Sequence, residues 1–229
     1  MKTILSTIAI SAILIAVPAA AQQPHGPGHG APQQNAPAGQ SGHQGHGNMN
    51  MQGMSPAAKA FAEANAKMHK DMTIQFSGNA DVDFARGMIP HHQGAIDMAE
   101  IVLQFGTDPS VKKLANEIIA AQKKEIAQMR GWLQTNGSLP AGPDATAVAK
   151  AFTDVNAKMH KDMTMTFSGT ADIEFMKGMI PHHEGAVDMA KVLLQYGRDP
   201  ELRKLANDVI RTQNEEITMM RDWLRKNGA

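Results

Sequence analysis

Residues 87–99 read GMIPHHQGAIDMA, and residues 178–190 read GMIPHHEGAVDMA. The two stretches lie 91 positions apart, and each places two adjacent histidines between methionines. The apolar residues of both recur at the spacing of a helix. The chain is therefore predicted to carry the same Met- and His-bearing helix twice.

The repeat extends well beyond these thirteen residues. Residues 58–137 align with 149–228 without a gap, and most aligned positions are identical. Two copies of this length are too few for a solenoid, so duplication is the simplest origin. We expect a first helical repeat over 55–137, a linker over 138–144 (SLPAGPD) and a second helical repeat over 145–229.

Each repeat is predicted to form three helices. The start and stop signals are caps, first-turn prolines and terminal glycines. In the first repeat they lie at Ser55–Pro56 and Gly78, at Asp81 and Gly106, and at Asp108–Pro109 and Asn136–Gly137; in the second, at Gly169, Gly197, Asp199–Pro200 and Asn227–Gly228. Pro90 should kink the second helix near Gly87 or mark its true start. Strand signals are absent and the loops are short, which predicts an all-α fold of two tandem three-helix repeats with antiparallel neighbours.

The first 54 residues are expected to lie outside the bundle. Residues 1–21 have one lysine, an apolar run and a small-residue cleavage site, which is typical of a secretory signal peptide. We expect cleavage near Ala21 and a mature protein in the periplasm or secreted. The absence of cysteine rules out disulfides in that oxidising compartment.

Composition and charge exclude several classes of protein. The chain has 22 basic and 22 acidic residues, which gives no basic patch for nucleic acid. No second stretch of about 18 apolar residues follows the signal, so no membrane span is expected in the mature protein. The unusual feature is 17 methionines and 10 histidines.

Residues 22–54 are rich in Gly, Pro, Gln and Asn and are predicted to be a disordered tail. Low-complexity drift and weak metal capture are equally good explanations of its histidines and methionines. These auxiliary residues are His25, His29, His43, His46, Met49, Met51 and Met54.

At 100° per residue, each predicted helix of the first repeat has one distinct face. On the first helix it holds Phe61, Asn65, Met68, His69, Met72 and Phe76. On the second it holds Phe84, Met88, His91, Met98 and Val102, with His92 at the margin. On the third it holds Leu114, Ile118, Gln122, Glu125, Ile126, Met129 and Trp132.

A methionine stripe at helical spacing is usually core packing, and that explanation is favoured for Met68, Met98 and Met129 taken singly. The three inward histidines of each repeat are harder to explain by core packing, because each unsatisfied buried polar group costs about 1–3 kcal/mol. A bound metal would compensate for that cost. Glu125 could accept the free N–H of a ligand histidine and so orient it, or it could form an ordinary buried His–Glu pair.

The donor types narrow the choice of metal. Thioether with imidazole suits Cu(I) and Ag(I), and imidazole alone suits Cu(II). Ca²⁺ and Mg²⁺ prefer oxygen ligands. A di-iron oxidase or ferritin would need Glu-x-x-His motifs, which the chain lacks, and no nucleophile arrangement stands out, so we expect no enzyme activity.

The segments FARGMIPHHQGAIDMA and FMKGMIPHHEGAVDMA, each preceded by MHKDMT, resemble the signature of the domain-of-unknown-function family 305. The resemblance covers both repeats and implies a ferritin-like helical bundle. Some exported members of the family are copper-binding resistance proteins, which implies copper as cofactor. With the donor types above, Cu(I) is preferred, Cu(II) is possible and Ag(I) is a surrogate. The implied ligands are His69, Met72, Met88, His91 and His92, with His160, Met163, Met179, His182 and His183 in the copy. Supporting or additional ligands are Met68, Met98, Glu125, Met129, Met159, Met189, Glu216 and Met220.

The expected function is therefore sequestration or transport of copper or silver in copper resistance or homeostasis. An efflux or delivery protein and a second copy of the chain are considered as partners. The alternative is an all-helical periplasmic stress chaperone or metal-sensing interaction protein, which an exposed apolar groove would favour.

Overall fold

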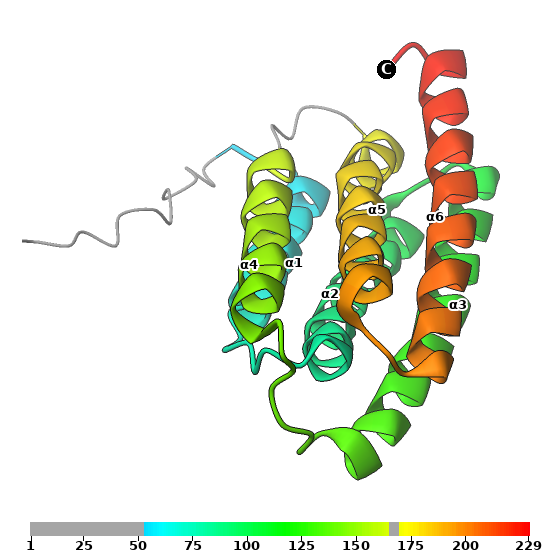
Figure 1. Cartoon of the computed structure of the whole chain (residues 1–229). Coiled ribbons are helices and arrows are strands. Elements are labelled where there is room, and N and C mark those ends of the chain that lie inside the picture. The colour runs from blue at the N-terminus through cyan, green and yellow to red at the C-terminus, as the bar shows by residue number, and fades with distance from the viewer. Residues whose placement is uncertain (1–52, 165–169) are drawn as a thin grey trace, which may run out of the picture. The chain divides into compact units, whose positions relative to one another are not determined.

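The computed structural model describes residues 53–164 and 170–229. These residues form six helices and no strand: α1 (Pro56–Asp71), α2 (Ala80–Phe105), α3 (Pro109–Asn136), α4 (Ala145–Asp162), α5 (Ala171–Tyr196) and α6 (Pro200–Lys226) (Figure 1). The all-α prediction is confirmed. No helix within these ranges is both long enough and apolar enough to cross a membrane.

Most helix ends lie where the capping signals predict them. The Ser55 side chain accepts a hydrogen bond from the backbone N–H of Ala58, and Asp108 and Asp199 cap α3 and α6 in the same way. These caps satisfy N–H groups that have no partner within their own helix. Gly106 and Gly137 follow the ends of α2 and α3 as expected.

Three boundary expectations need correction or lie outside the described residues. The helix α1 ends at Asp71, with Met72 as its C-cap, so Phe76 is not on this helix and Gly78 lies beyond a non-helical segment. Pro90 lies inside α2 and does not mark its start. Gly169 lies outside the described residues.

The helices are arranged in three layers of two (Figure 1). The pair α2 and α5 forms the middle layer, and these two helices pack against each other. On one side α1 packs on α2 and α4 packs on α5; on the other side α3 packs on α2 and α6 packs on α5. The middle layer therefore joins the two repeats.

Each repeat caps a turn of the other. The Asp81 carboxylate, at the start of α2, accepts backbone N–H bonds from Arg198 and Asp199 at 3.0–3.1 Å. Its counterpart Asp172, at the start of α5, accepts backbone N–H bonds from Thr107 at 2.9 Å and Asp108 at 3.3 Å. The same contact is therefore made twice, once from each repeat to the other. This is the pattern of an isologous dimer interface, here formed within one chain.

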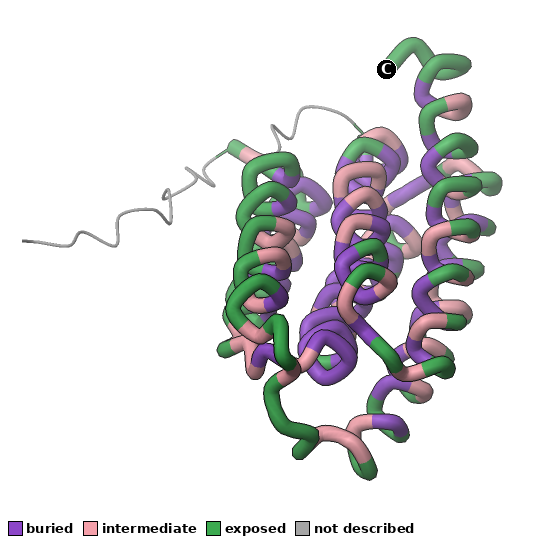
Figure 2. Tube along the Cα trace, in the orientation of Figure 1, coloured by how far each residue is buried: buried purple, intermediate pink, exposed green. Residues whose placement is uncertain are grey.

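One apolar core runs through both repeats. Figure 2 shows the buried positions concentrated on α2 and α5, while the outward sides of α4 and α6 are exposed. Phe84 and Val102 of α2 and Phe175 and Leu193 of α5 are fully buried in the same cluster. The middle helices therefore position their histidines inside a water-excluded interior.

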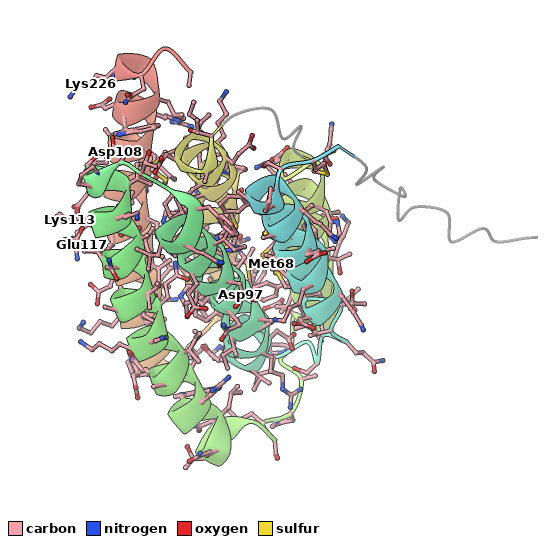
Figure 3. The ribbon with its side chains drawn as sticks, turned by 180° about the vertical axis from the view of Figure 1, so that it is seen from behind. Met68, Asp97, Asp108, Lys113, Glu117 and Lys226 are labelled. Carbon is pink, nitrogen blue, oxygen red and sulfur yellow. The ribbon has the colours of Figure 1, made fainter. Side chains whose placement is uncertain are left out.

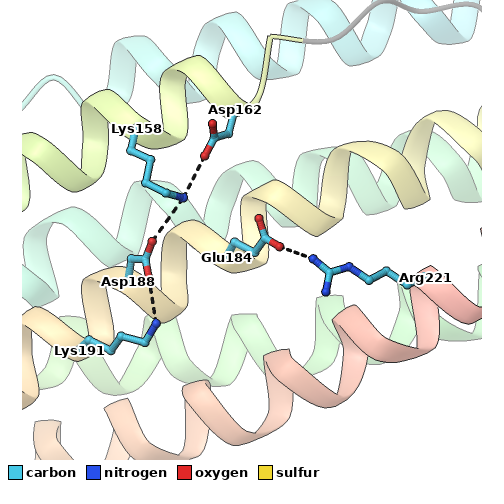
Figure 4. A network of polar contacts seen from close by, with 6 residues as sticks. All are labelled: Lys158, Asp162, Glu184, Asp188, Lys191 and Arg221. Carbon is cyan, nitrogen blue, oxygen red and sulfur yellow. Dashed lines mark hydrogen bonds and ion pairs between the residues drawn. The ribbon is translucent and has the colours of Figure 1, made fainter.

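Ion pairs on the surface link α4, α5 and α6, the helices of the second repeat (Figure 4). The Lys158 ammonium of α4 lies 3.5 Å from the Asp188 carboxylate of α5. Arg221 of α6 donates to Glu184 of α5 at 2.5 Å. Exposed pairs of this kind contribute about 0–1 kcal/mol each, so the core is the main source of stability.

Candidate metal centre

His91 and His182 meet at the interface between α2 and α5. Both side chains are fully buried, and their ring centroids lie 3.8 Å apart. The Nε2–H group of His182 donates to the backbone carbonyl oxygen of His91 at 3.0 Å. This bond fixes the tautomer of His182 and leaves its Nδ1 with a lone pair.

Three ring nitrogens of this pair have no hydrogen-bond partner among the described residues: Nδ1 and Nε2 of His91, and Nδ1 of His182. A buried polar group left in this way costs about 1–3 kcal/mol. Orphaned imidazole nitrogens are therefore expensive unless another species binds them.

The second histidine of each motif turns toward the outer helix of its own repeat. His92 donates through Nε2–H to the Glu125 carboxylate of α3 at 2.6 Å, and His183 does the same to Glu216 of α6 at 2.6 Å. In both rings Nδ1 is buried and has no partner in the described part of the chain. A carboxylate that holds one ring nitrogen while the other presents its lone pair is the usual arrangement around a metal-bound histidine.

The inner histidines are held in the neutral form. Burial, followed by the charge of the nearby His182, holds the pKa of His91 well below its ordinary value of about 6.5. Burial and then the charge of His183 lower the pKa of His182 in the same direction. A neutral imidazole is the form that can bind a metal at neutral pH.

Thioether sulfurs approach the middle helices at two glycines. A Cβ built at Gly94 of α2 would lie 2.5 Å from the sulfur of Met68, which in Figure 3 is seen on α1. A Cβ built at Gly185 of α5 would lie 2.8 Å from the sulfur of Met159 and 3.3 Å from Nε2 of His91. The absence of a side chain at Gly185 thus leaves room for both the thioether of α4 and the His91 ring of α2.

A second histidine pair lies between α1 and α4. The rings of His69 and His160 stack with centroids 3.4 Å apart and planes 25° apart. They line a pocket of about 290 Å³, together with Met72, Asn156 and Met159. His69 is buried, whereas His160 is exposed. This pocket therefore brings together imidazole and thioether groups of both repeats, of which His160 reaches the surface.

The remaining predicted donors are distributed over the core. Met88 and Met179 are fully buried beside the histidine motifs, and the methyl carbon of Met189 lies 3.0 Å from the position a Cβ would take at Gly87. Also buried are Met72, Met98, Met129, Met163 and Met220. Met54 is half-buried, and His25, His29, His43, His46, Met49 and Met51 lie outside the described residues.

Within the described ranges, no group of three or more histidine and carboxylate side chains has the geometry to hold a metal ion. The donors that do come together are histidine pairs with methionines beside them.

The pairing between the repeats was not predicted from the sequence. The expected ligand sets each lay within one repeat, whereas the closest ring contacts are His69–His160 and His91–His182, between the repeats. The available signal was the identity of the two inward faces, since identical faces can pack against each other about a two-fold axis.

The arrangement can be compared with known proteins. The profile of DUF305, a domain of unknown function, matches residues 81–224, which is more than half of the chain. The chain belongs to the DUF305 family.

Solved structures of similar proteins share the helical fold. CopM in a silver-bound form is 39% identical, with a TM-score of 0.50, over 64% of this chain and 95% of CopM. CopM in the Cu(I)-bound form is 38% identical, with a TM-score of 0.50, over 64% and 96%. A DUF305 protein from Streptomyces coelicolor is 31% identical, with a TM-score of 0.53, over 67% and 95%.

A shorter match links this DUF305 chain to the uncharacterised protein L153 of Acanthamoeba polyphaga mimivirus. The two are 40% identical over 53 residues, which is 23% of this chain and 35% of the viral protein. The match thus spans about a third of that relative.

Proposed function

We propose that this protein binds copper as Cu(I), with Ag(I) as a surrogate, through imidazole and thioether groups shared between its two repeats. The observation that supports this most strongly is the fully buried pair His91–His182, whose rings lie 3.8 Å apart and leave three ring nitrogens without a partner among the described residues. The donor set, neutral imidazole beside thioether, suits a soft monovalent cation.

The buried histidines lower the stability of the metal-free core. His91, His182, His92 and His183 together leave five buried ring nitrogens without a partner among the described residues. At about 1–3 kcal/mol each, that penalty is comparable with the whole stability of a domain, about 5–15 kcal/mol. A metal that accepts lone pairs from these rings would offset part of it.

The structural neighbours support the same assignment. CopM has been solved in silver-bound, Cu(I)-bound and Cu(II)-bound forms at 38–39% identity to this chain. Imidazole without thioether would serve Cu(II), so we include Cu(II) as a weaker ligand. Binding, without turnover of a substrate, is the activity that we propose.

We also propose where the protein works and what it does with the metal. The signal-like segment 1–21 leads us to propose export to the periplasm or beyond, with the metal held for resistance or homeostasis. The tail over 22–54 would act as a weak collector of metal, and an efflux or delivery protein would receive it.

The chaperone alternative has no support from the described surface. Leu139 and Met219 are the large hydrophobic side chains that are exposed in the described ranges, and they lie on different parts of the chain. An apolar groove for unfolded clients would need a contiguous patch of several hundred Å².

Anaerobic titration of the mature protein with Cu(I), Ag(I), Cu(II) and Zn(II), followed by metal counting, tests the proposal. We expect tight uptake of Cu(I) and Ag(I), weaker uptake of Cu(II) and little Zn(II). Equal affinity for Zn(II) and Cu(I), or no tight uptake of either monovalent ion, would contradict it.

A further inference from the structure

Met159 lies between the pocket of α1 and α4 and the middle layer that holds the buried histidine pair. Met159 lines the pocket with His69 and His160, yet its side chain is almost fully buried. It therefore lies at the inner end of the pocket.

The other side of Met159 faces the middle layer. Its sulfur lies 2.8 Å, and Nε2 of His91 3.3 Å, from the position that a Cβ would occupy at Gly185. Both donor atoms therefore face the same point beside Gly185, which has no side chain. Nε2 of His91 has no partner among the described residues and is free to accept an ion there.

We propose that the pocket is the loading site of the protein and that Met159 passes a soft cation from it to His91. This inference rests on the proposed function and adds a route to it. The ion would first be held by the stacked pair His69–His160, of which His160 is exposed, and then by the thioether of Met159.

The chemistry of each group suits its place in this route. A thioether carries no charge and does not titrate, so it can hold a soft ion in a dry channel without a proton to release. Methionine also has three rotatable bonds, which let its sulfur swing between two neighbouring donors. Transfer by ligand exchange leaves the charge and oxidation state of the ion unchanged.

The route predicts that blocking the pocket slows loading without removing the final site. Thr153 is an exposed pocket residue of α4 whose hydroxyl donates to the carbonyl of Ala149. Thr218 of α6 is an exposed helical threonine with the equivalent bond to Asn214 and does not line the pocket. Thr153→Trp and Thr218→Trp therefore form a matched pair of substitutions.

A second pair tests the thioether itself. Met159→Leu removes the sulfur and keeps most of the volume, which a core usually tolerates. Met176→Leu makes the same change at a buried methionine of α5 that does not line the pocket and that no step of the route uses.

The measurement mixes the full mature protein anaerobically with Cu(I) supplied as its acetonitrile complex. After timed delays, a chromophoric Cu(I) chelator captures all copper that the protein does not yet protect. We expect Thr153→Trp and Met159→Leu to slow protection about ten-fold, within the one to three decades that variants of one site usually span, with the final amount unchanged. Both control variants should match wild type.

Wild-type protection rates in both test variants would overturn the route. A lower final amount at an unchanged rate in Met159→Leu would also overturn it, because Met159 would then be a permanent ligand. If the wild-type protein itself protected no copper, the proposed function would fail first.

Discussion

The imidazole of His182 donates to the backbone carbonyl of His91 at 3.0 Å, and these two residues are equivalent positions of the two repeats. The bond makes the pair asymmetric, because His91 Nε2 has no hydrogen-bond partner among the described residues. The two equivalent histidines therefore differ in which ring nitrogens have no partner among the described residues. A donor cluster of this kind is incomplete without both repeats.

The double substitution His91→Ala with His182→Ala should abolish the tightest Cu(I) binding while helicity persists. The reason is that these rings hold three of the orphaned buried nitrogens. Circular dichroism and competition with a chelator of known affinity measure the two properties. Unchanged affinity in a helical double variant would show that these histidines are structural.

Glu125→Gln and Glu216→Gln should weaken Cu(I) binding about 10–100-fold, the usual effect of losing the partner that orients a metal-bound histidine. Each carboxylate accepts the Nε2–H of its histidine at 2.6 Å. Glu117→Gln is the control, because Glu117 lies on the exposed side of α3 and pairs with Lys113. The same small loss of affinity in all three variants would exclude an orienting role.

Stability of the metal-free protein should fall as the pH drops below about 6.5. The pKa values of His91 and His182 are lowered in the fold, so below the ordinary value only the unfolded chain takes up these protons. Above about pH 6.5 the two histidines do not change the free energy of unfolding. Below that pH, each one lowers the free energy of unfolding by up to about 1.4 kcal/mol per pH unit. Urea unfolding between pH 7.5 and 5 measures the slope, which should be flatter in the His91→Leu/His182→Leu variant. Equal slopes would show that the two rings do not titrate differently on unfolding.

Gly94→Ala should destabilise the protein by about 1–3 kcal/mol, because the new methyl group would overpack the core against Met68. Gly131 of α3 is the matched control, since a Cβ there meets nothing within 4 Å. Gly131→Ala should stabilise by about 0.5–1 kcal/mol through helix propensity. Thermal unfolding compares the two; equal, stabilising shifts would mean that Met68 does not pack closely on α2.

Most helix boundaries were predictable because residues next to each boundary determine where the helix begins or ends. Proline and capping side chains at Ser55, Asp108 and Asp199 specify where the backbone N–H groups find partners. The end of α1 at Asp71 was not predictable in this way, since no glycine or proline follows until Gly78.

The inward faces were also predictable, because helical periodicity placed Met88, His91 and Glu125 toward the interior. Their partners were not, since periodicity within one repeat carries no information about how two repeats dock. The pairing of His69 with His160 and of Asp81 with the turn at Arg198 depends on that docking. The position of Met159 and His91 beside one another's repeat depends further on Gly185, because a Cβ there would lie 2.8 Å from the Met159 sulfur and 3.3 Å from Nε2 of His91.

Binding of a soft cation at the buried histidines of the two repeats can be observed directly. The measurement is a crystal structure of the protein loaded with one equivalent of Cu(I), with anomalous diffraction data collected at the copper edge. We expect a copper peak between α2 and α5, within bonding distance of a ring nitrogen of His91 or His182. A peak confined to surface residues, with none at this pair, would contradict it.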